Sequence, residues 1–292
     1  PAAKVEGPRR LPAPKRLVAL GDVHGDLAAT RAALRLAGAI DDKDAWIGGD
    51  LVVVQTGDQL DRGDGEQAIV DLFDRLAEEA SKSGGAVIAL NGNHELMNVE
   101  GDFRYVTPGG FKDFDDPSPM AKTDPRIASI PEAGRGRAAA FLPGGLYAQK
   151  LAKRGVTVVV GDTLFVHGGV LPEHARYGLG RIDREVSQWM SGTLKQLPKI
   201  MQGDESPVWS RRYSGDPKKA DCEVLDEALK ETDTRRMVVG HTVQKGGVTS
   251  ACDEKVWRID VGMAAHYGGP TEVLEIVGED VKTLRAKSAV EP

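Results

Sequence analysis

The stretch Leu17-Val-Ala-Leu-Gly-Asp-Val-His-Gly-Asp26 decides the fold, because a short apolar run leads into a glycine-flanked aspartate and histidine. Residues 16–20 predict a short buried strand that ends at Gly21. Residues 26–37 place leucines and alanines at helical spacing, and Gly38 is a natural stop for that helix. Asp22 and His24 are two residues apart, so on extended backbone their side chains point to the same side. The stretch therefore predicts a strand, a polar site at its carboxyl end and a helix behind it.

The same order of elements continues along the chain. Residues 51–55 are rich in β-branched side chains and residues 86–90 are a second apolar run, so both predict buried strands. Between them, residues 67–80 carry an apolar stripe at helical spacing that Gly84 and Gly85 terminate. Alternating strands and helices are typical of an α/β domain with a mainly parallel sheet.

The remaining segments are expected to join one domain. Residues 1–14 contain four prolines and no apolar period, and predict an extended lead-in. Residues 101–145 are rich in Pro, Gly, Asp and Arg, and predict an irregular insertion, above all at 113–126. Further elements are predicted as a hairpin of strands at 156–160 and 163–166 through Gly161 and Asp162, strands at 237–239, 256–261 and 272–277, and a helix at 221–231. We therefore expect a single domain over residues 15–292.

Polar clusters follow five of the predicted strands. Each has flanking glycines and side chains that can bind a metal; the five are Gly21-Asp-Val-His-Gly25, Gly57-Asp-Gln-Leu-Asp-Arg-Gly63, Asn91-Gly-Asn-His-Glu95, Val166-His-Gly-Gly169 and Val239-Gly-His-Thr242. Ligands of open α/β sheets bind at the carboxyl ends of strands, where such loops converge. Any one pattern alone is more typical of a turn, a helix start or a satisfied polar side chain. Four of the six histidines (24, 94, 167 and 241) fall in these clusters, however, and that conjunction favours one functional site.

The donor types indicate a centre of two cations. Oxygen and imidazole donors without thiolates suit Mn²⁺, Fe, Zn²⁺ or Mg²⁺ rather than a soft metal. The inventory of these clusters is two aspartates, one asparagine and three histidines. Six such donors are more than one small cation normally takes. Two cations that share a bridging carboxylate would use all six. Two cations about 3.5–4 Å apart stabilise the attacking and leaving oxygens of a phosphoryl displacement and acidify a shared water.

Composition excludes several other classes of protein. The formal net charge of −6 makes a non-specific nucleic-acid binder or an anionic-membrane binder a poor hypothesis. No apolar run approaches the roughly 18 residues of a membrane helix, so no membrane insertion is expected. Cys222 and Cys252 can form at most one bridge, and the sequence leaves open whether they pair or stay free thiols.

The ordered set GDVHG (21–25), GDQLDRG (57–63), GNHE (92–95), VHGG (166–169) and GHT (240–242) resembles the metal-dependent phosphoprotein phosphatase family, within the calcineurin-like metallophosphoesterase superfamily. The run from Asn93 to Val106, with Gln59 in the second motif, is similar to the Shewanella-like branch. The resemblance implies an α/β calcineurin-like metallophosphoesterase fold, in which two mixed β-sheets pack as a sandwich flanked by helices. It also implies a single metallophosphatase catalytic domain over residues 15–292, with the metals at one edge of the sheets.

The resemblance implies hydrolysis of phosphate esters by a hydroxide that bridges two divalent ions, with Mn²⁺ the cation most expected to support activity. It assigns the metal ligands as Asp22, His24 and Asp58 for one ion, and Asp58, Asn93, His167 and His241 for the other.

The resemblance also assigns the catalytic groups. His94 would be the general acid that protonates the leaving oxygen, with Asp61 raising its pKa and orienting it. Arg62 would hold the phosphoryl oxygens. The second arginine would lie in Val208-Trp-Ser-Arg-Arg212, where alignment favours Arg211 over a solvated Arg212.

The substrate is expected to be a phosphorylated protein or peptide, with phosphotyrosine a serious candidate beside phosphoserine and phosphothreonine. A small-molecule phosphoesterase, such as a dinucleoside polyphosphate hydrolase, is the alternative. A catalytically silent metal-binding protein is a remote one, since His94, Asp61 and Arg62 are intact. Regulatory subunits are not implied, because the Ser-Ala-Pro-Asn-Tyr motif of the eukaryotic Ser/Thr enzymes is replaced by residues 257–263.

Two expectations concern the surroundings of the site and the compartment. Asp102, Arg104 and Tyr105 follow the acid histidine, and either shape the substrate pocket or form a buried salt bridge with packing. Bacterial members of the branch are often exported, so a Pro/Ala-rich beginning favours the periplasm over the cytoplasm.

Overall fold

The computed structural model describes residues 6–114 and 124–286. Its strands are β1 (Arg10–Leu11), β2 (Leu17–Leu20), β3 (Val52–Gln55), β4 (Ala86–Ala89), β5 (Thr157–Val160), β6 (Thr163–Val166), β7 (Arg236–Val239), β8 (Thr249–Ala251), β9 (Val256–Arg258), β10 (Glu272–Val277) and β11 (Asp280–Arg285). They form two mixed sheets. One has the order β1-β5-β6-β7-β9-β8 and the other the order β11-β10-β2-β3-β4. The two sheets pack face to face, as the resemblance to the metallophosphoesterases implied.

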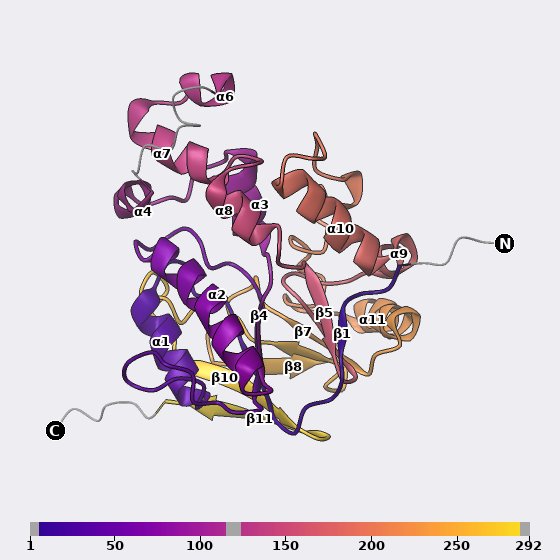
Figure 1. Cartoon of the computed structure of the whole chain (residues 1–292). Coiled ribbons are helices and arrows are strands. Elements are labelled where there is room, and N and C mark those ends of the chain that lie inside the picture. The colour runs from indigo at the N-terminus through magenta and orange to yellow at the C-terminus, as the bar shows by residue number, and fades with distance from the viewer. Residues whose placement is uncertain (1–5, 115–123, 287–292) are drawn as a thin grey trace.

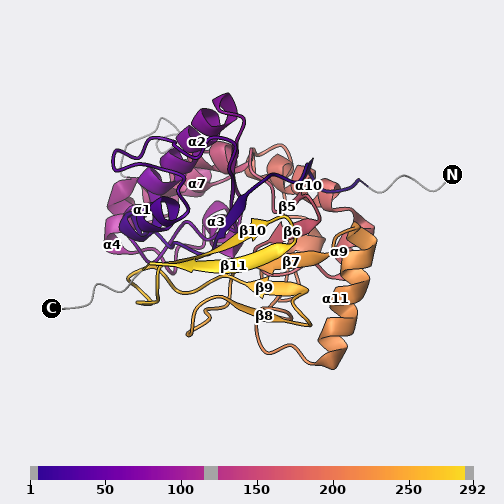
Figure 2. The ribbon, with the colours of Figure 1, turned by 90° about the horizontal axis from the view of Figure 1, so that it is seen from below.

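The helices are α1 (Leu27–Leu36), α2 (Glu66–Lys82), α3 (Asn93–Glu100), α4 (Pro108–Asp113), α6 (Pro125–Ala128), α7 (Glu132–Phe141), α8 (Leu146–Leu151), α9 (Pro172–Tyr177), α10 (Leu179–Met190) and α11 (Lys219–Thr232), with a 3₁₀ turn at Lys199–Met201. They cover both outer faces of the sandwich: α1 and α2 lie on one side, and α9 to α11 lie on the other (Figures 1 and 2). Within the described ranges, no helix combines the length and the apolar character needed to cross a bilayer.

The alternation of side chains along β2 shows how the layers are held. Leu17 and Ala19 pack into the cluster between the sheets, together with Phe165 of β6. Val18 and Leu20 point the other way and pack under α1 and α2. Every residue of β2 is therefore buried, which is typical of a strand covered on both faces.

The strand and helix pattern of the first ninety residues is confirmed. β2, β3 and β4 are parallel neighbours, joined by α1 and α2, and β10 and β11 complete their sheet in antiparallel pairing. The predicted hairpin is confirmed as well, because β5 and β6 pair antiparallel from Thr157 opposite Val166 to Val160 opposite Thr163. Sequence patterns did not predict α3, α8, α9 or α10, nor the strands β8 and β11.

The prediction that residues 101–145 are irregular was wrong for much of that segment. It contains the helices α4, α6 and α7, which gather at one end of the molecule near α3 (Figure 1). These helices are short, and Gly134 and Gly136 interrupt the apolar pattern of α7, so the helical period is hidden. Of the predicted loop at 113–126, residues 115–123 lie outside the described residues.

The structure also shows two contacts that the sequence did not predict, the pairing of β1 with β5 and the disulfide between Cys222 and Cys252. The lead-in over residues 1–14 is not wholly without structure, because β1 pairs parallel with β5, with Leu11 opposite Val160. A strand of two residues has no period of its own, which explains why it was missed; residues 1–5 lie outside the described residues. Cys222 of α11 and Cys252, in the turn between β8 and β9, form a disulfide.

Candidate metal and catalytic centre

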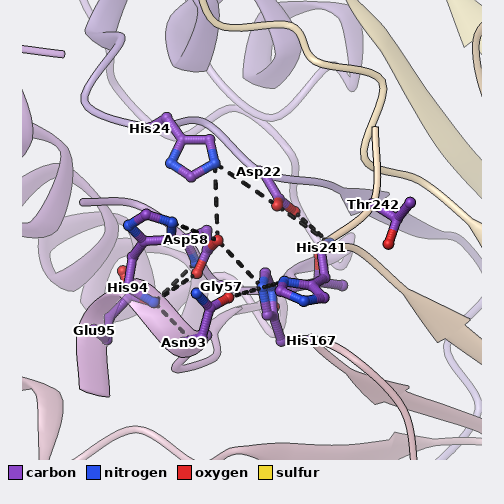
Figure 3. Close-up of polar contacts among 12 residues, drawn as sticks. Asp22, His24, Gly57, Asp58, Asn93, His94, Glu95, His167, His241 and Thr242 are labelled. Atoms are coloured by element: carbon purple, nitrogen blue, oxygen red, sulfur yellow. Dashed lines mark hydrogen bonds and ion pairs between the residues drawn. The ribbon is translucent and has the colours of Figure 1, made fainter. Parts of the chain in front are cut away.

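All six predicted metal ligands meet at the carboxyl ends of parallel strands from both sheets (Figure 3). All six are buried. Asp22 and His24 follow β2, Asp58 follows β3, Asn93 begins α3 after β4, His167 follows β6 and His241 follows β7. The donor atoms of His24, Asp58 and His94 lie within 4.8 Å of one another, and so do those of Asp58, His167 and His241. The two groups share Asp58, which is therefore placed to bridge two cations.

One half of the centre gathers lone pairs that a divalent cation would satisfy. His167 Nδ1 donates to the carbonyl oxygen of Thr56 at 3.0 Å, so in the neutral ring Nε2 carries a lone pair. That Nε2 lies 2.9 Å from Asn93 Oδ1 and 3.2 Å from Asp58 Oδ2, and both of these atoms are acceptors. It also lies 3.2 Å from His241 Nδ1. These residues fit a divalent ion, because acceptors so close together repel one another without one.

The other half repeats this arrangement around His24, where one ring nitrogen donates to a backbone carbonyl and the other faces carboxylate oxygens. Its Nδ1 donates to the carbonyl oxygen of Leu60 at 3.1 Å. Its Nε2 faces Asp58 Oδ2 at 3.8 Å and Asp22 Oδ2 at 3.9 Å. Burial lowers the pKa of His24 to about 3, and burial, with repulsion from His167, lowers that of His241 to about 2. Both rings are therefore neutral and able to bind a metal.

Buried carboxyls crowd the same space. Burial raises the pKa of Asp22, and the nearby carboxyls of Asp260 and Asp58 raise it further. Burial also raises the pKa of Asp260 to about 6. Asp260 lies just after β9 and was not predicted; its only sequence signal is an acid that follows an apolar strand. Positive charge at this point would stabilise all three carboxylates.

Glu95 is a second residue that the sequence reasoning left without a role. Its buried carboxylate accepts hydrogen bonds from the backbone N–H groups of Asp58 and Gln59, both at 2.8 Å, and of Gly92 at 2.6 Å. It thereby ties the loop that carries Asp58 to the first turn of α3 (Figure 3). Its sequence signal was available, because Glu95 is the last residue of the GNHE motif.

His94 and Asp61 form a hydrogen-bonded pair beside the candidate ligands. His94 Nδ1 lies 2.5 Å from Asp61 Oδ2, and both side chains are buried. Burial lowers the pKa of His94, but the charges of Asp58 and Asp61 outweigh it and leave the pKa raised. The free Nε2 faces the centre, 3.8 Å from Asp58 Oδ2. The predicted pairing of His94 with Asp61 is thus present in the structure.

The predicted phosphate arginines border the centre. Arg211 donates to the carbonyl oxygen of His241 at 3.0 Å and to Thr242 Oγ1 at 2.8 Å, so it lies next to one ligand. Arg212 points elsewhere and pairs with Glu205 and Asp221. This difference agrees with the choice of Arg211 over Arg212.

Arg62 lies between two tyrosine rings at the mouth of the site. Its guanidinium carbon is 4.8 Å from the ring centre of Tyr105 and 5.2 Å from that of Tyr267, whose hydroxyl it also contacts. The two rings remain partly exposed, at 41% and 36%. A cavity of about 350 Å³ lined by His24, Arg62 and His266 opens beside them. No sequence pattern had pointed to Tyr267.

The residues that follow His94 divide between the two expectations. Tyr105 lines the mouth of the site, with its ring centre 5.3 Å from that of His94. Asp102 and Arg104 pair with each other at 2.7 Å, but this ion pair is largely exposed, so the expected buried salt bridge is wrong.

Several residues of this centre have strained backbone. His24, Asp58, Asp61, Arg62 and His241 all have positive φ, between 39° and 68°, a region that side chains other than glycine avoid. Non-glycine residues keep such angles only where the surrounding structure over-determines them. A β-carbon at Gly92 would lie 2.3 Å from Asp58 Oδ1, so glycine is required there.

Comparisons with known proteins agree with this geometry. The family model of the calcineurin-like phosphoesterases matches residues 15–245. Shewanella-like protein phosphatase 2 of Arabidopsis thaliana is 42% identical, covering 91% of this chain and 76% of that relative. An uncharacterized protein of Schizosaccharomyces pombe is 32% identical, covering 93% of this chain and 80% of its own length. The solved structure of the cold-active protein-tyrosine phosphatase of a psychrophilic Shewanella species has a similar fold, with a TM-score of 0.73 at 24% identity over 96% of this chain and 83% of that one.

Proposed function

Because the chain belongs to the calcineurin-like phosphoesterase family and to its Shewanella-like phosphatase branch, and is therefore a metal-dependent phosphatase, we propose that it acts on phosphoproteins and prefers phosphotyrosine. The observation that carries this preference is the placement of Arg62 between Tyr105 and Tyr267. A phosphotyrosine ring can stack on these exposed rings while its phosphate reaches the arginine. Phosphoserine has no ring to stack. The names of three similar solved structures, which are protein tyrosine phosphatases, support the same choice, while a Ser/Thr phosphatase of Saccharomyces cerevisiae is less similar, with a TM-score of 0.62.

We assign the cation ligands from the convergence of donor atoms. Asp22, His24 and Asp58 would hold one divalent ion, and Asp58, Asn93, His167 and His241 the second. When bound, the two ions acidify a water and supply positive charge to the oxygens of the phosphoryl group. Mn²⁺ is our proposal for the ion that supports activity, since these oxygen and imidazole donors suit it.

The residues of the chain itself position the phosphoryl group and move one proton. Arg62 and Arg211 bind the phosphoryl oxygens, and a planar guanidinium offers two parallel donors for this. His94 donates the proton on Nε2 to the leaving oxygen of the substrate. Asp61 accepts the hydrogen bond from His94 Nδ1 and so fixes the ring with Nε2 directed at the site.

Matched peptides that differ only in carrying phosphotyrosine, phosphoserine or phosphothreonine test the substrate. With Mn²⁺ present, we expect kcat/KM for phosphotyrosine to exceed the other two by about tenfold, the effect of roughly 1.4 kcal/mol of ring contact. Tyr105→Leu and Tyr267→Leu should reduce that ratio, whereas Tyr105→Phe, which keeps the ring, should retain it. Equal turnover of phosphoserine, or better turnover of a dinucleoside polyphosphate, would refute the proposal.

We also propose that the protein works in an oxidising compartment such as a bacterial periplasm. The disulfide between Cys222 and Cys252 supports this, since such bonds persist mainly in oxidising compartments. Cell fractionation of the source organism tests it, and recovery of the protein with reduced thiols in the cytoplasm would contradict it.

A further inference from the structure

Behind the His94–Asp61 pair lies a completely buried guanidinium, that of Arg137 in α7, whose exposed fraction is 0%. Buried arginines are rare, because removing a charge from water is costly unless every donor is paired. Arg137 comes from the segment at 101–145, and α7 packs against α3, the helix that carries His94 (Figure 1).

Acceptors surround all of the N–H donors of Arg137. Nε donates to Asn98 Oδ1 at 2.8 Å, and Nη1 donates to Glu66 Oε2 at 2.5 Å and to the carbonyl oxygen of Gly110 at 2.9 Å. Nη2 donates to Glu66 Oε1 at 2.8 Å and to Asp61 Oδ1 at 3.4 Å. The five contacts match the five N–H groups of a guanidinium.

Three phenylalanine rings close the environment from the sides. The guanidinium carbon lies 4.9 Å from the ring centre of Phe141, 5.1 Å from that of Phe114 and 5.9 Å from that of Phe103. These rings exclude water, so the hydrogen bonds of Arg137 have no solvent competitor. The orientation of the guanidinium is therefore fixed.

Each of the groups that hold Asp61 is in turn held by Arg137. Asp61 Oδ1 accepts from Asn98 Nδ2 at 3.0 Å, and the backbone N–H of Asp61 donates to Glu66 Oε1. Asn98 and Glu66 both bind Arg137, and Asp61 Oδ1 also receives Nη2 directly. The opposite oxygen, Oδ2, is the one that orients His94.

We infer that Arg137 is a positioning residue for catalysis, which fixes Asp61 and through it the direction of His94 Nε2. This inference rests on the proposed role of His94 as the proton donor. Lysine cannot replace Arg137, because an ammonium has three donors and no planar fork. Without the guanidinium, Asp61 Oδ1 keeps the amide of Asn98 alone, and the carboxylate can turn away from the imidazole.

The test is the dependence of the rate on the leaving group of the substrate. A misdirected general acid matters for phenyl phosphate, whose leaving oxygen needs a proton, and hardly at all for 2,4-dinitrophenyl phosphate. For Arg137→Lys we expect kcat on phenyl phosphate to fall about 10- to 100-fold, part of the 10²–10⁴ that proton transfer contributes. On 2,4-dinitrophenyl phosphate we expect less than a threefold loss, with KM and bound metal unchanged.

Two further variants keep the result decisive. Arg137→Met combined with Glu66→Gln removes the ion pair without leaving a buried charge unpaired, and should show the same leaving-group dependence if Arg137→Lys does not fold. Arg135 is an exposed arginine of the same helix, so Arg135→Met is the matched control and should have the parent's kcat on both aryl phosphates. In the background of His94→Asn, Arg137→Lys should cause no further loss on phenyl phosphate.

An equal loss of kcat on both aryl phosphates would mean that Arg137 only supports the fold, and would overturn the inference. Full activity of Arg137→Lys and of the double variant Arg137→Met with Glu66→Gln would overturn it as well. His94→Asn separates the two levels of the argument. If that variant shows no leaving-group dependence, then the proposed proton donor is wrong and the role of Arg137 falls with it. If His94→Asn shows it and the Arg137 variants do not, the inference alone fails.

Discussion

Glu95→Gln tests how the loop that carries Asp58, the proposed bridging ligand, is held in place. The carboxylate of Glu95 accepts four backbone hydrogen bonds. Oε2 accepts from Asp58 at 2.8 Å and Gly92 at 2.6 Å, and Oε1 accepts from Gln59 at 2.8 Å and Leu60 at 3.3 Å. Glutamine keeps one acceptor oxygen, so two backbone N–H groups lose their partner and instead face the donors of the new amide.

The magnitude follows from the number of bonds lost. A hydrogen bond to a charged group contributes about 1.5–3 kcal/mol net, so the loss of two destabilises the native loop by roughly 3–6 kcal/mol before it relaxes. Total stabilities of domains are only about 5–15 kcal/mol, so this is a large share. Relaxation would move the backbone of Asp58, and that converts part of the lost stability into weaker metal binding.

Two measurements check this prediction. Urea unfolding in excess chelator gives the change in the free energy of unfolding, and competition with a chromophoric chelator gives the affinity for Mn²⁺. Glu100→Gln is the matched control, because Glu100 ends the same helix with an exposed side chain and should change neither quantity. If Glu95→Gln stayed within about 0.5 kcal/mol of the parent, the usual range of surface substitutions, and bound Mn²⁺ unchanged, the reasoning would be refuted.

Three other perturbations have expected outcomes. His94→Asn should lower kcat on phenyl phosphate by about 10²–10⁴ while metal analysis shows unchanged cation content; a fully active variant would remove the proton-donor role. Replacing Cys222 and Cys252 together by serine should lower the free energy of unfolding by up to about 4 kcal/mol in urea, because a bridge across 30 residues restricts the unfolded chain, and an unchanged midpoint would contradict this. Burial lowers the pKa of His174 to about 4, and its Nδ1 accepts the N–H of Leu171 at 3.0 Å, so the folded state needs the neutral ring. Since the unfolded state then binds the extra proton, this stability is full above about pH 6.5 and is lost as the pH falls towards 4, by up to about 3 kcal/mol. His174→Asn should flatten that part of the pH profile in chelator, and a profile as steep as that of the parent would contradict the reasoning.

The centre was largely predictable from the sequence because its residues obey a local rule. Asp22, Asp58 and His167 each lie within three residues of the end of an apolar run, and an apolar run of that length indicates a strand. Parallel strands bring their carboxyl ends to one edge of a sheet, so side chains far apart in sequence meet there without any further signal. The strand ends therefore predicted where the polar side chains gather, whereas the division of these residues into metal ligands, proton donor and phosphate-binding arginines came from the resemblance to the metallophosphoesterases.

The supporting residues were not predictable in the same way. Arg137 lies in a helix whose period two glycines hide, and its partners Asp61 and Glu66 are more than 70 residues away. Tyr267 lies in a loop after β9 without any motif, and reaches Arg62 across 205 residues. Such contacts depend on how loops and short helices pack over the sheet edge, and a residue pattern within one segment carries no information about that packing.

The strain and the charges of the centre together explain why it needs a rigid scaffold. Five residues at positive φ, converging lone pairs and buried carboxyls all destabilise the folded chain when no cation is bound. The sandwich offsets this cost, because β2 and β3 are buried on both faces and cannot shift to relieve it. Divalent ions would remove much of the same cost, since they bind the folded centre and not the unfolded chain. The net charge of −6 is therefore a poor guide to this site, where bound divalent ions would offset the buried acids and would leave the arginines at its border able to meet a phosphate dianion.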